Sequence, residues 1–198
     1  MPRPTSLFAS VVPLFALVLA CSSDPAPITS NTAACDTYCA KIATVCKGAN
    51  AQYIDAQTCA SMCSLMDAGA TRDVVGDSVA CRNNSLSSAQ EVQDETQRRD
   101  PCFQSGPYST RCAADECAAF CKLDLAVCTG VDTAYATLGE CQAACGRIKA
   151  KQNGFATEPL TTTTTGNSLI CRAYHLEAAS TNRAVHCAHT KETGGPCN

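Results

Sequence analysis

Apolar residues recur every three or four positions along several stretches of the chain, which is the spacing of one face of an α-helix. In residues 35–46 this face consists of Cys35, Cys39, Ile42 and Cys46. Residues four positions apart lie one turn apart on the same side of a helix, so each Cys-x3-Cys pair presents its two sulfurs together. The pattern predicts a helix whose buried face is lined largely by sulfur.

A second helix is predicted over residues 56–66, where Cys59 and Cys63 lie on the apolar face. Gly48 and Asn50 separate it from the first helix. Glycine suits the position just after a helix C-terminus because that position often takes left-handed dihedral angles, and asparagine suits an N-cap. The two helices are therefore expected to form an antiparallel hairpin with a tight turn.

The whole pattern occurs twice along the chain. The spacing Cys-x3-Cys-x6-Cys-x12-Cys-x3-Cys begins at Cys35 and begins again at Cys117. An overlay without gaps also matches Gly48 with Gly130 and one tyrosine with another. Five cysteines in the same register, together with matched glycines, indicate an internal duplication.

Each copy continues into a third predicted helix and two further cysteines, which gives an N-terminal unit (residues 35–112) and a C-terminal unit (residues 117–198). The third helix is expected to begin near Ser78 in one unit and near Ser168 in the other, because serine is a good N-cap. The predicted fold is all-α and disulfide-rich. Each unit is a stapled helical hairpin with a third helix and a disulfide-closed tail.

Pairing of the cysteines follows in part from hairpin geometry. Facing residues of an antiparallel hairpin have position numbers with a constant sum, which predicts four disulfides: Cys35–Cys63, Cys39–Cys59, Cys117–Cys145 and Cys121–Cys141. The other cysteines of the two units are expected to pair as Cys46–Cys81, Cys102–Cys112, Cys128–Cys171 and Cys187–Cys197, although sequence leaves other pairings open. No bridge is expected to join the units. The stapled hairpins resemble the small plant α-hairpinin peptides, a likeness of architecture that implies no activity.

The N-terminus predicts export. Arg3 precedes an apolar run, Leu7–Ala20, that ends directly before Cys21. This resembles a bacterial lipoprotein signal, a family in which the cysteine is acylated and becomes the mature N-terminus. Residues 1–20 are then a signal peptide, and residues 21–34 are the lipidated cysteine with a flexible tether. The alternative is an ordinary secretory signal, in which Cys21 has no special role.

Composition agrees with export. The chain of 198 residues has 17 cysteines and no tryptophan. Small cores need covalent staples, and disulfides persist in oxidising compartments. The protein is expected to be an outer-membrane lipoprotein of the bacterial cell envelope.

The net charge of −3 gives no excess of basic residues of the kind that nucleic-acid-binding proteins have. The expected partners are the membrane, through the lipid on Cys21, and an unknown protein or small-molecule ligand.

Several catalytic chemistries find no motif in this sequence. There is no Cys-x2-Cys for a zinc ribbon or thioredoxin-like site, and no glycine-rich phosphate loop. Gly76–Val79 resembles the nucleophile block of GDSL-type hydrolases, but a serine nucleophile needs a base and residues 1–174 contain no histidine. Ser78 is therefore expected to be a helix cap. The chain is predicted to be no enzyme and to use no cofactor.

All three histidines lie in the C-terminal unit, at His175, His186 and His189. Neutral imidazole is a common ligand of copper, zinc and iron, so the cluster could hold a metal. Alternatively the histidines cap helices, form hydrogen bonds or lie on the surface. The N-terminal unit has Ser85 and Gln104 in place of the first and last, so the fold does not require histidine there. We expect that the three do not converge, because they come from separate segments, and that no metal binds tightly.

The C-terminal segments resemble cysteine-rich predicted lipoproteins of myxobacterial-type bacteria. The likeness lies in Cys171–Leu176, His186–His189 and Gly194–Cys197, and it extends to the hairpin spacing of both units. It implies location and fold, and no activity. The predicted function is a non-enzymatic, lipid-anchored binding or structural module of the cell envelope. The alternative is a metal-binding or redox protein that uses the three histidines or, as in copper-delivery proteins of that spacing, reduced Cys-x3-Cys pairs.

Overall fold

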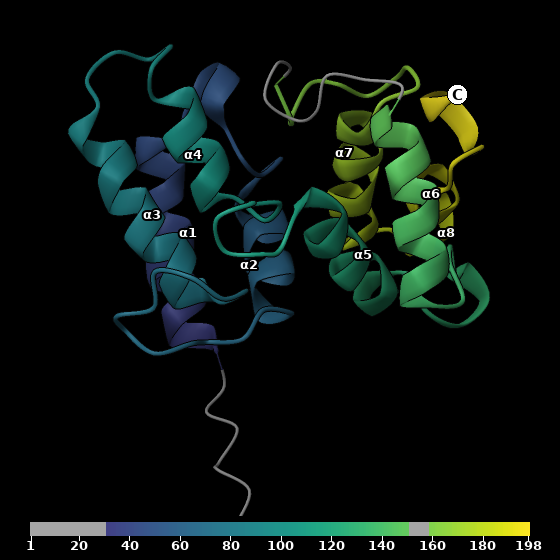
Figure 1. The fold of residues 1–198 in the computed structure, drawn as a ribbon, viewed down its shortest axis with the longest axis horizontal. Helices are drawn as coiled ribbons and strands as arrows, with labels where there is room; N and C mark the ends of the chain where they lie inside the picture. Colours follow the sequence, from purple (N-terminus) through teal and green to yellow (C-terminus); the bar gives the residue numbers. More distant parts are fainter. Residues whose placement is uncertain (1–30, 151–158) are drawn as a thin grey trace, which may run out of the picture.

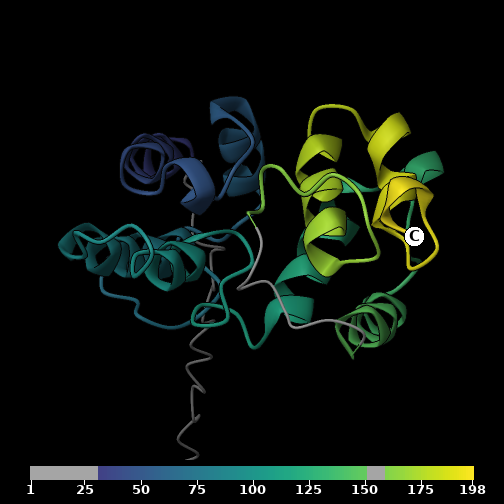
Figure 2. The ribbon, with the colours of Figure 1, turned by 90° about the horizontal axis from the view of Figure 1, so that it is seen from above.

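The computed structural model describes residues 31–150 and 159–198, and every regular element in these ranges is a helix. Two groups of helices lie side by side in both ribbon views (Figure 1, Figure 2). The helices α1 to α4 belong to the N-terminal unit, and α5 to α8 belong to the C-terminal unit. The predicted all-α, disulfide-rich fold is confirmed. The predicted signal peptide, Cys21 and most of the tether lie outside the described residues.

The N-terminal unit begins with the predicted hairpin. Helices α1 (Thr32–Val45) and α2 (Ala56–Ser64) are joined through the short 3-10 helix η1 (Gly48–Asn50). Gly48 adopts a φ of 55°, the left-handed conformation that the turn requires. Helices α3 (Val79–Glu91) and α4 (Arg99–Ser105) pack against each other, and α3 also packs on α1.

The C-terminal unit has the same order of elements and ends in three short helical segments. Its hairpin and third helix are α5 (Glu116–Val127), η2 (Gly130–Asp132), α6 (Leu138–Ala150) and α7 (Leu169–Ala179). The short segments are α8 (Arg183–His186), η3 (Cys187–Thr190) and η4 (Gly195–Cys197). Helix α7 is buried between the hairpin and these segments, and eight of its apolar and charged side chains are at most 3% exposed: Leu169, Ile170, Cys171, Arg172, Ala173, Leu176, Glu177 and Ala179.

Four disulfides staple the two hairpins as predicted. They are Cys35–Cys63, Cys39–Cys59, Cys117–Cys145 and Cys121–Cys141. Each joins facing helices at a Cα–Cα distance of 5.7 to 5.9 Å, which is within the ordinary range for a disulfide. The constant-sum rule therefore holds in both hairpins.

The other four predicted pairs are wrong. In place of Cys46–Cys81, Cys102–Cys112, Cys128–Cys171 and Cys187–Cys197, the structure contains Cys46–Cys102, Cys81–Cys112, Cys128–Cys187 and Cys171–Cys197. No bridge joins the two units among the described residues, as expected.

The start of α3 explains the correct pairing. The backbone N–H of Val79 donates to the carbonyl of Asp67, just after α2, so α3 begins at the open end of the hairpin. Cys46 lies at the other end, beside the turn, where α4 packs on η1. Cys81 is therefore too far from Cys46, which pairs with Cys102 of α4 instead.

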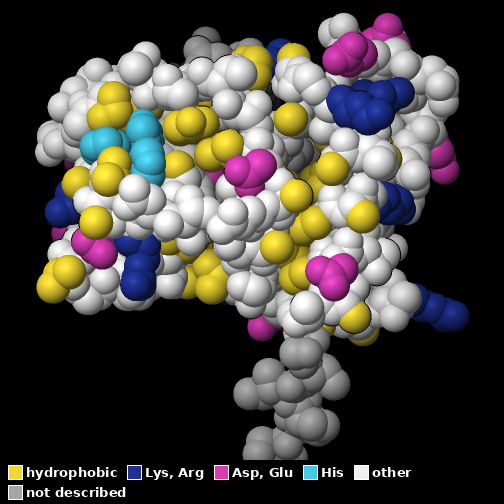
Figure 3. Space-filling view, turned by 180° about the vertical axis from the view of Figure 1, so that it is seen from behind, with side chains coloured by type: hydrophobic (Ala, Val, Ile, Leu, Met, Phe, Trp, Pro, Cys, Tyr) yellow, Lys and Arg dark blue, Asp and Glu magenta, His cyan; other side chains and the backbone are white. Residues whose placement is uncertain are grey.

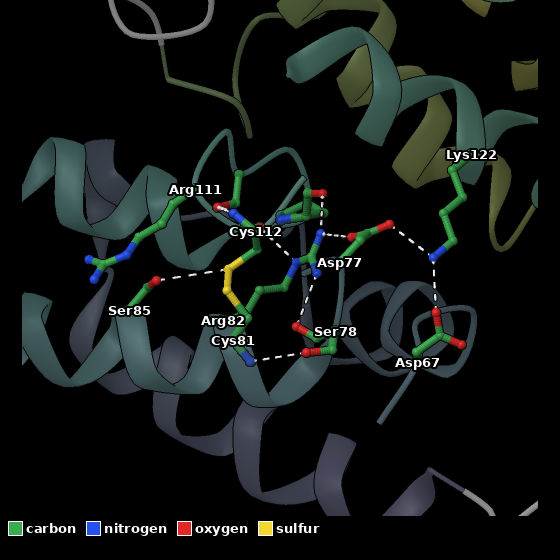
Figure 4. Close-up of polar contacts among 12 residues, drawn as sticks. Asp67, Asp77, Ser78, Cys81, Arg82, Ser85, Arg111, Cys112 and Lys122 are labelled. Carbon is green, nitrogen blue, oxygen red and sulfur yellow. Dashed lines mark hydrogen bonds and ion pairs between the residues drawn. A yellow bond between two sulfur atoms is a disulfide. The ribbon is translucent and has the colours of Figure 1, made fainter. Parts of the chain in front are cut away.

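A buried arginine ties each third helix to its tail. In the N-terminal unit the guanidinium of Arg82 donates to the carbonyl oxygens of Ser78, Gly106 and Pro107 at 3.0 to 3.1 Å (Figure 4). It also forms an ion pair of 2.6 Å with Asp77. Since Arg82 is 1% exposed, these partners replace its hydration. The guanidinium therefore fixes the tail of the unit against the start of α3.

Charged and polar contacts join the two units in addition to a hydrophobic core cluster that includes residues of both. Lys122 of α5 lies between Asp67 and Asp77 of the N-terminal unit, at 3.2 and 2.9 Å (Figure 4). On α7, the carboxyl group of Glu177 accepts a hydrogen bond of 3.1 Å from the backbone N–H of Ile54. Burial raises the pKa of Glu177 well above its ordinary value. This carboxyl group therefore favours its neutral form at the interface.

Candidate metal centre

The three histidines converge in the structure. The Nδ1 atom of His175 lies 2.9 Å from Nδ1 of His186 and 3.3 Å from Nδ1 of His189. In the space-filling view their rings form one group on the surface of the C-terminal unit (Figure 3). Our expectation that they would not converge is therefore wrong.

A tight reversal of the chain after α7 brings the rings together. The backbone N–H groups of Thr181 and Asn182 both donate to the carbonyl of Ala178, and α8 begins at the next residue. Helix α8 and η3 then pack back along α7. His186 and His189 lie three residues apart on this continuous helical segment, so they share a face and point to the same ring on α7.

Disulfides fix both segments that carry the imidazoles. Cys187 lies between His186 and His189 in the sequence, and it is bridged to Cys128, the residue directly after α5. Cys171 lies one turn before His175 on α7, and it is bridged to Cys197 of η4. The rings are therefore held by a covalent framework, which limits the conformational entropy that binding a ligand would cost.

A second buried arginine holds the segment after His189. The guanidinium of Arg172 donates to the carbonyl oxygens of Ser168, Lys191 and Glu192 at 2.9, 2.9 and 2.6 Å. These contacts match those of Arg82 in the N-terminal unit. Our sequence analysis missed this role, although a Cys-Arg pair at the start of both third helices was a signal for it.

The hydrogen-bond partner of Nε2 shows which ring nitrogen of His175 carries the hydrogen. Its Nε2 atom lies 3.1 Å from the carbonyl oxygen of Thr164. A carbonyl can only accept, so Nε2 carries the hydrogen and Nδ1 keeps its lone pair. In the structure that lone pair accepts a hydrogen bond from the Nδ1–H group of a neighbouring ring, with His186 at 2.9 Å and His189 at 3.3 Å. Metal-binding histidines commonly have this arrangement, in which the other ring nitrogen donates to a carbonyl or carboxylate.

The environment keeps two of the rings neutral. Burial lowers the pKa of His175 below its ordinary value, and the neighbouring His189 and His186 rings lower it further against the opposing bond to Thr164. Burial also lowers the pKa of His186, again with a contribution from His189. Neutral imidazole is the form that binds a metal, and His175 already has its Nδ1 lone pair free of hydrogen. A metal at Nδ1 of His186 would require the hydrogen of that ring to move to Nε2.

Gly195 provides the space for one of the rings. It has a φ of 49°, and a Cβ atom built on it would lie 2.3 Å from Cδ2 of His189. Any side chain at this position would therefore push the imidazole away from its neighbours. The glycine is needed both for its backbone conformation and for the close approach of the ring.

The spacing of the three Nδ1 atoms suits one metal ion. A tetrahedral ion with bonds of about 2.0–2.1 Å to nitrogen has ligand atoms about 3.3 Å apart. The two Nδ1 separations from His175 are 2.9 and 3.3 Å, and all three donor atoms lie within 4.8 Å of one another. His186 and His189 are half-buried, so the group opens toward solvent. Three imidazoles with an open fourth position can hold zinc or divalent copper.

Different side chains occupy the corresponding corner of the N-terminal unit, the region where the third helix meets the tail. Ser85 stands in place of His175, and its hydroxyl lies 3.9 Å from the sulfur of Cys112 (Figure 4). Gln104 stands in place of His189, and its side-chain oxygen accepts a hydrogen bond of 2.9 Å from the backbone N–H of Arg111. This corner is thus closed by hydrogen bonds within the tail.

The structure also shows the roles of Ser78 and of the Cys-x3-Cys pairs, which the sequence left as candidates for a nucleophile and for copper ligands. The hydroxyl of Ser78 accepts a hydrogen bond of 3.2 Å from the backbone N–H of Cys81, so Ser78 caps α3 as expected. All sixteen described cysteines are in disulfides. The Cys-x3-Cys pairs therefore offer no thiolate to copper in this structure.

Comparison with known proteins finds no significant similarity. The chain matches no family model, and no curated protein or solved structure is similar to it at a significant level. Within the two described ranges, no helix is both long and apolar enough to cross a bilayer.

Proposed function

We propose that the protein is a lipid-anchored, non-enzymatic metal-binding protein of the bacterial cell envelope. Its C-terminal unit binds one divalent copper or zinc ion through His175, His186 and His189. The observation that supports the metal is the approach of Nδ1 of His186 and of His189 to Nδ1 of His175, at 2.9 and 3.3 Å, with ligand atoms of all three residues within 4.8 Å of one another. This proposal joins the two functions that the sequence predicted as alternatives.

The disulfides support the compartment. Eight bridges in the described residues are typical of an oxidising environment outside the cytoplasm. The apolar run before Cys21 supports the finer part of the proposal, a lipid anchor at the outer membrane. A tethered protein in this position meets metal ions that enter the envelope.

The ligand type determines the metals expected. Imidazole nitrogen suits copper, zinc and nickel better than calcium or magnesium, which prefer oxygen. Among divalent ions the general order of affinity places copper above zinc. The open fourth position allows an ion to enter and leave from solvent. We therefore expect reversible binding, with tighter binding of copper than of zinc.

Calorimetric titration of the purified, oxidised protein in detergent tests the metal. We expect one equivalent of copper or zinc per chain. His186→Ala with His189→Ala should abolish this binding, because two of three ligands are lost. Gln104→Ala is the matched control, since Gln104 is the counterpart of His189, and it should leave binding unchanged. Absence of stoichiometric binding, or equal binding by the double variant, would contradict the proposal.

Fractionation of cells tests the anchor. The Cys21→Ser variant cannot be acylated, so we expect it in the soluble extracytoplasmic fraction, whereas the natural protein should remain with membranes. Retention of the variant in the membrane fraction would show that the anchor is not a lipid on Cys21.

A further inference from the structure

His175 belongs to a second group of possible ligands. The ligand atoms of Cys171, His175 and Cys197 lie within 4.8 Å of one another, and all three side chains are buried. In the structure the two sulfurs are joined in a disulfide and cannot bind a metal. The bridge thus lies directly beside an imidazole that the proposed metal centre uses.

We propose that opening this bridge converts the site into a second metal centre, made of the two cysteine thiolates and His175. The inference rests on the proposed function and deepens it, because it gives the same site a second ligand set for a different class of ion. Thiolates are soft ligands, so the second set favours monovalent copper over divalent copper, whereas zinc suits both sets. The redox state of one disulfide would therefore shift the C-terminal unit from divalent toward monovalent copper and other soft ions.

The reductant is a dithiol, and the step balances. One thiolate of the dithiol attacks a sulfur of the Cys171–Cys197 bridge, which forms a mixed disulfide and releases the other cysteine as a thiolate. The second thiol of the dithiol then attacks the mixed disulfide. Two electrons pass to the protein, and the dithiol becomes a disulfide. The protons of the two cysteine thiols pass to the buffer when the metal binds.

The segment around Cys197 gives the reductant a route to a buried bridge. Cys197 lies in η4, a single 3-10 turn of three residues. Backbone hydrogen bonds from Gly166 to Pro196 and from Cys197 to Gly194 hold this turn in place. Short segments with few backbone hydrogen bonds open locally at a small fraction of the cost of global unfolding.

Metal binding favours the reduced state once it forms. A ligand that binds only the reduced form stabilises that form in proportion to the logarithm of its concentration relative to Kd. The imidazole of His175 is held beside the two sulfurs, so the third ligand needs no rearrangement of α7. Both ligand sets include His175, and so one ion at a time is expected to occupy the site.

The N-terminal unit contains the matched bridge without the imidazole. Cys81–Cys112 has the same place in its unit as Cys171–Cys197, but its neighbour is the hydroxyl of Ser85. Opening of this bridge would give two thiolates and no nitrogen ligand from that neighbour. A metal should therefore protect reduced Cys171 and Cys197 and leave reduced Cys81 and Cys112 open to alkylation.

Anaerobic titration of the oxidised protein with dithiothreitol, with and without cadmium, tests the inference. The readouts are the thiolate-to-cadmium charge-transfer absorption and mapping of the cysteines that react with an alkylating reagent. We expect cadmium to make Cys171–Cys197 the first bridge to open, with one cadmium bound per chain. Earlier opening of any other bridge, or opening without a charge-transfer band, would overturn the inference.

Variants of the histidines identify the ligands. His175→Ser gives the arrangement of the N-terminal unit, and it should weaken cadmium binding by about tenfold or more. His186→Ala with His189→Ala should keep the charge-transfer band, because neither residue belongs to the second ligand set. Equal cadmium affinity in His175→Ser and the natural protein would overturn the inference.

A further variant removes the need for a reductant. Cys171→Ser leaves Cys197 as a free thiol beside His175, so cadmium should give a charge-transfer band that is lost when His175→Ser is added. A band that persists in the combined variant would contradict the role of His175. Failure of the oxidised natural protein to bind copper or zinc would refute the proposed function alone. Binding by that form without a cadmium–thiolate site would refute only this inference.

Discussion

The region where the third helix meets the tail has the same disulfide and buried arginine in both units. The other side chains in that region differ between the units. In each unit a disulfide joins the third helix to the tail, Cys81–Cys112 in one and Cys171–Cys197 in the other. A buried arginine beside each bridge donates to three carbonyl oxygens. The N-terminal corner is filled by hydroxyl and amide groups, and the C-terminal corner by three imidazoles. The bridge and the arginine contacts therefore form without histidine, so the imidazoles need an explanation other than stability.

The buried arginines should show the largest effects. Arg172→Met leaves three carbonyl oxygens without their donor, which we expect to lower the free energy of unfolding by about 3–5 kcal/mol and to weaken metal binding. Arg82→Met should cost at least as much, because Arg82 also donates to three carbonyl oxygens and in addition forms the ion pair with Asp77. It should leave metal affinity unchanged, since the N-terminal corner carries no imidazole. Urea unfolding and calorimetry of both variants measure the two quantities.

Equal loss of metal affinity in the Arg82 and Arg172 variants would contradict this comparison. It would mean that the two units act as one cooperative body, and that the tail of the C-terminal unit is not positioned by its own arginine.

Asp124 marks the next difference between the units. It takes the place in α5 that Ile42 has in α1, and both side chains are buried. Burial raises the pKa of Asp124 from 3.8 to about 6, despite the opposing influence of Thr190 and Lys191. The folded state thus holds this proton more tightly than the unfolded state does. The resulting stability is fully present below pH 3.8 and is lost as the pH rises through about 6.

The variant Asp124→Ile copies the N-terminal unit. At pH 7 it should raise the free energy of unfolding by about 3 kcal/mol, which is the cost of ionising the buried carboxyl group. The variant should also reduce the fall in stability between pH 4 and pH 7, to which the buried carboxyl group of Glu177 contributes as well. Urea unfolding at both pH values measures the effect, and an unchanged pH dependence would show that Asp124 is not its source.

Gly195→Ala should have the smallest effect on stability and a clear effect on the metal. The new methyl group would clash with the ring of His189, so we expect metal affinity to fall by about tenfold or more. The positive φ should cost about 1 kcal/mol of stability. Gly146→Ala is the control, because a Cβ there meets no atom within 4 Å. Equal metal affinity in both variants would show that the position of His189 is not critical.

Local rules explain which parts of the structure could be predicted. The spacing of cysteines on facing helices determines the hairpin bridges, so Cys39–Cys59 and its relatives were predicted correctly. The tail bridges depend on where α3 and α7 begin relative to the hairpin turn. That is a tertiary contact, the bond from Val79 to Asp67, which no periodicity in the sequence encodes.

The histidine cluster was only partly predicted, for a similar reason. The three histidines could be named from the sequence, but their convergence depends on the reversal at residues 180–182, which contains neither glycine nor proline. Ser180, Thr181 and Asn182 signal a loop, but such a cluster does not define the direction in which the chain turns. The buried roles of Arg82 and Arg172 were missed because arginine is seldom fully buried, although its repetition after a cysteine was visible.

Nitrogen NMR of the imidazoles during titration with zinc is the most direct test of the metal centre. The three Nδ1 resonances should shift together and saturate at one equivalent, while Nε2 of His175 keeps its hydrogen and its bond to the carbonyl of Thr164. Unchanged Nδ1 resonances, or loss of the hydrogen on Nε2 of His175, would contradict a centre formed by the three facing Nδ1 atoms.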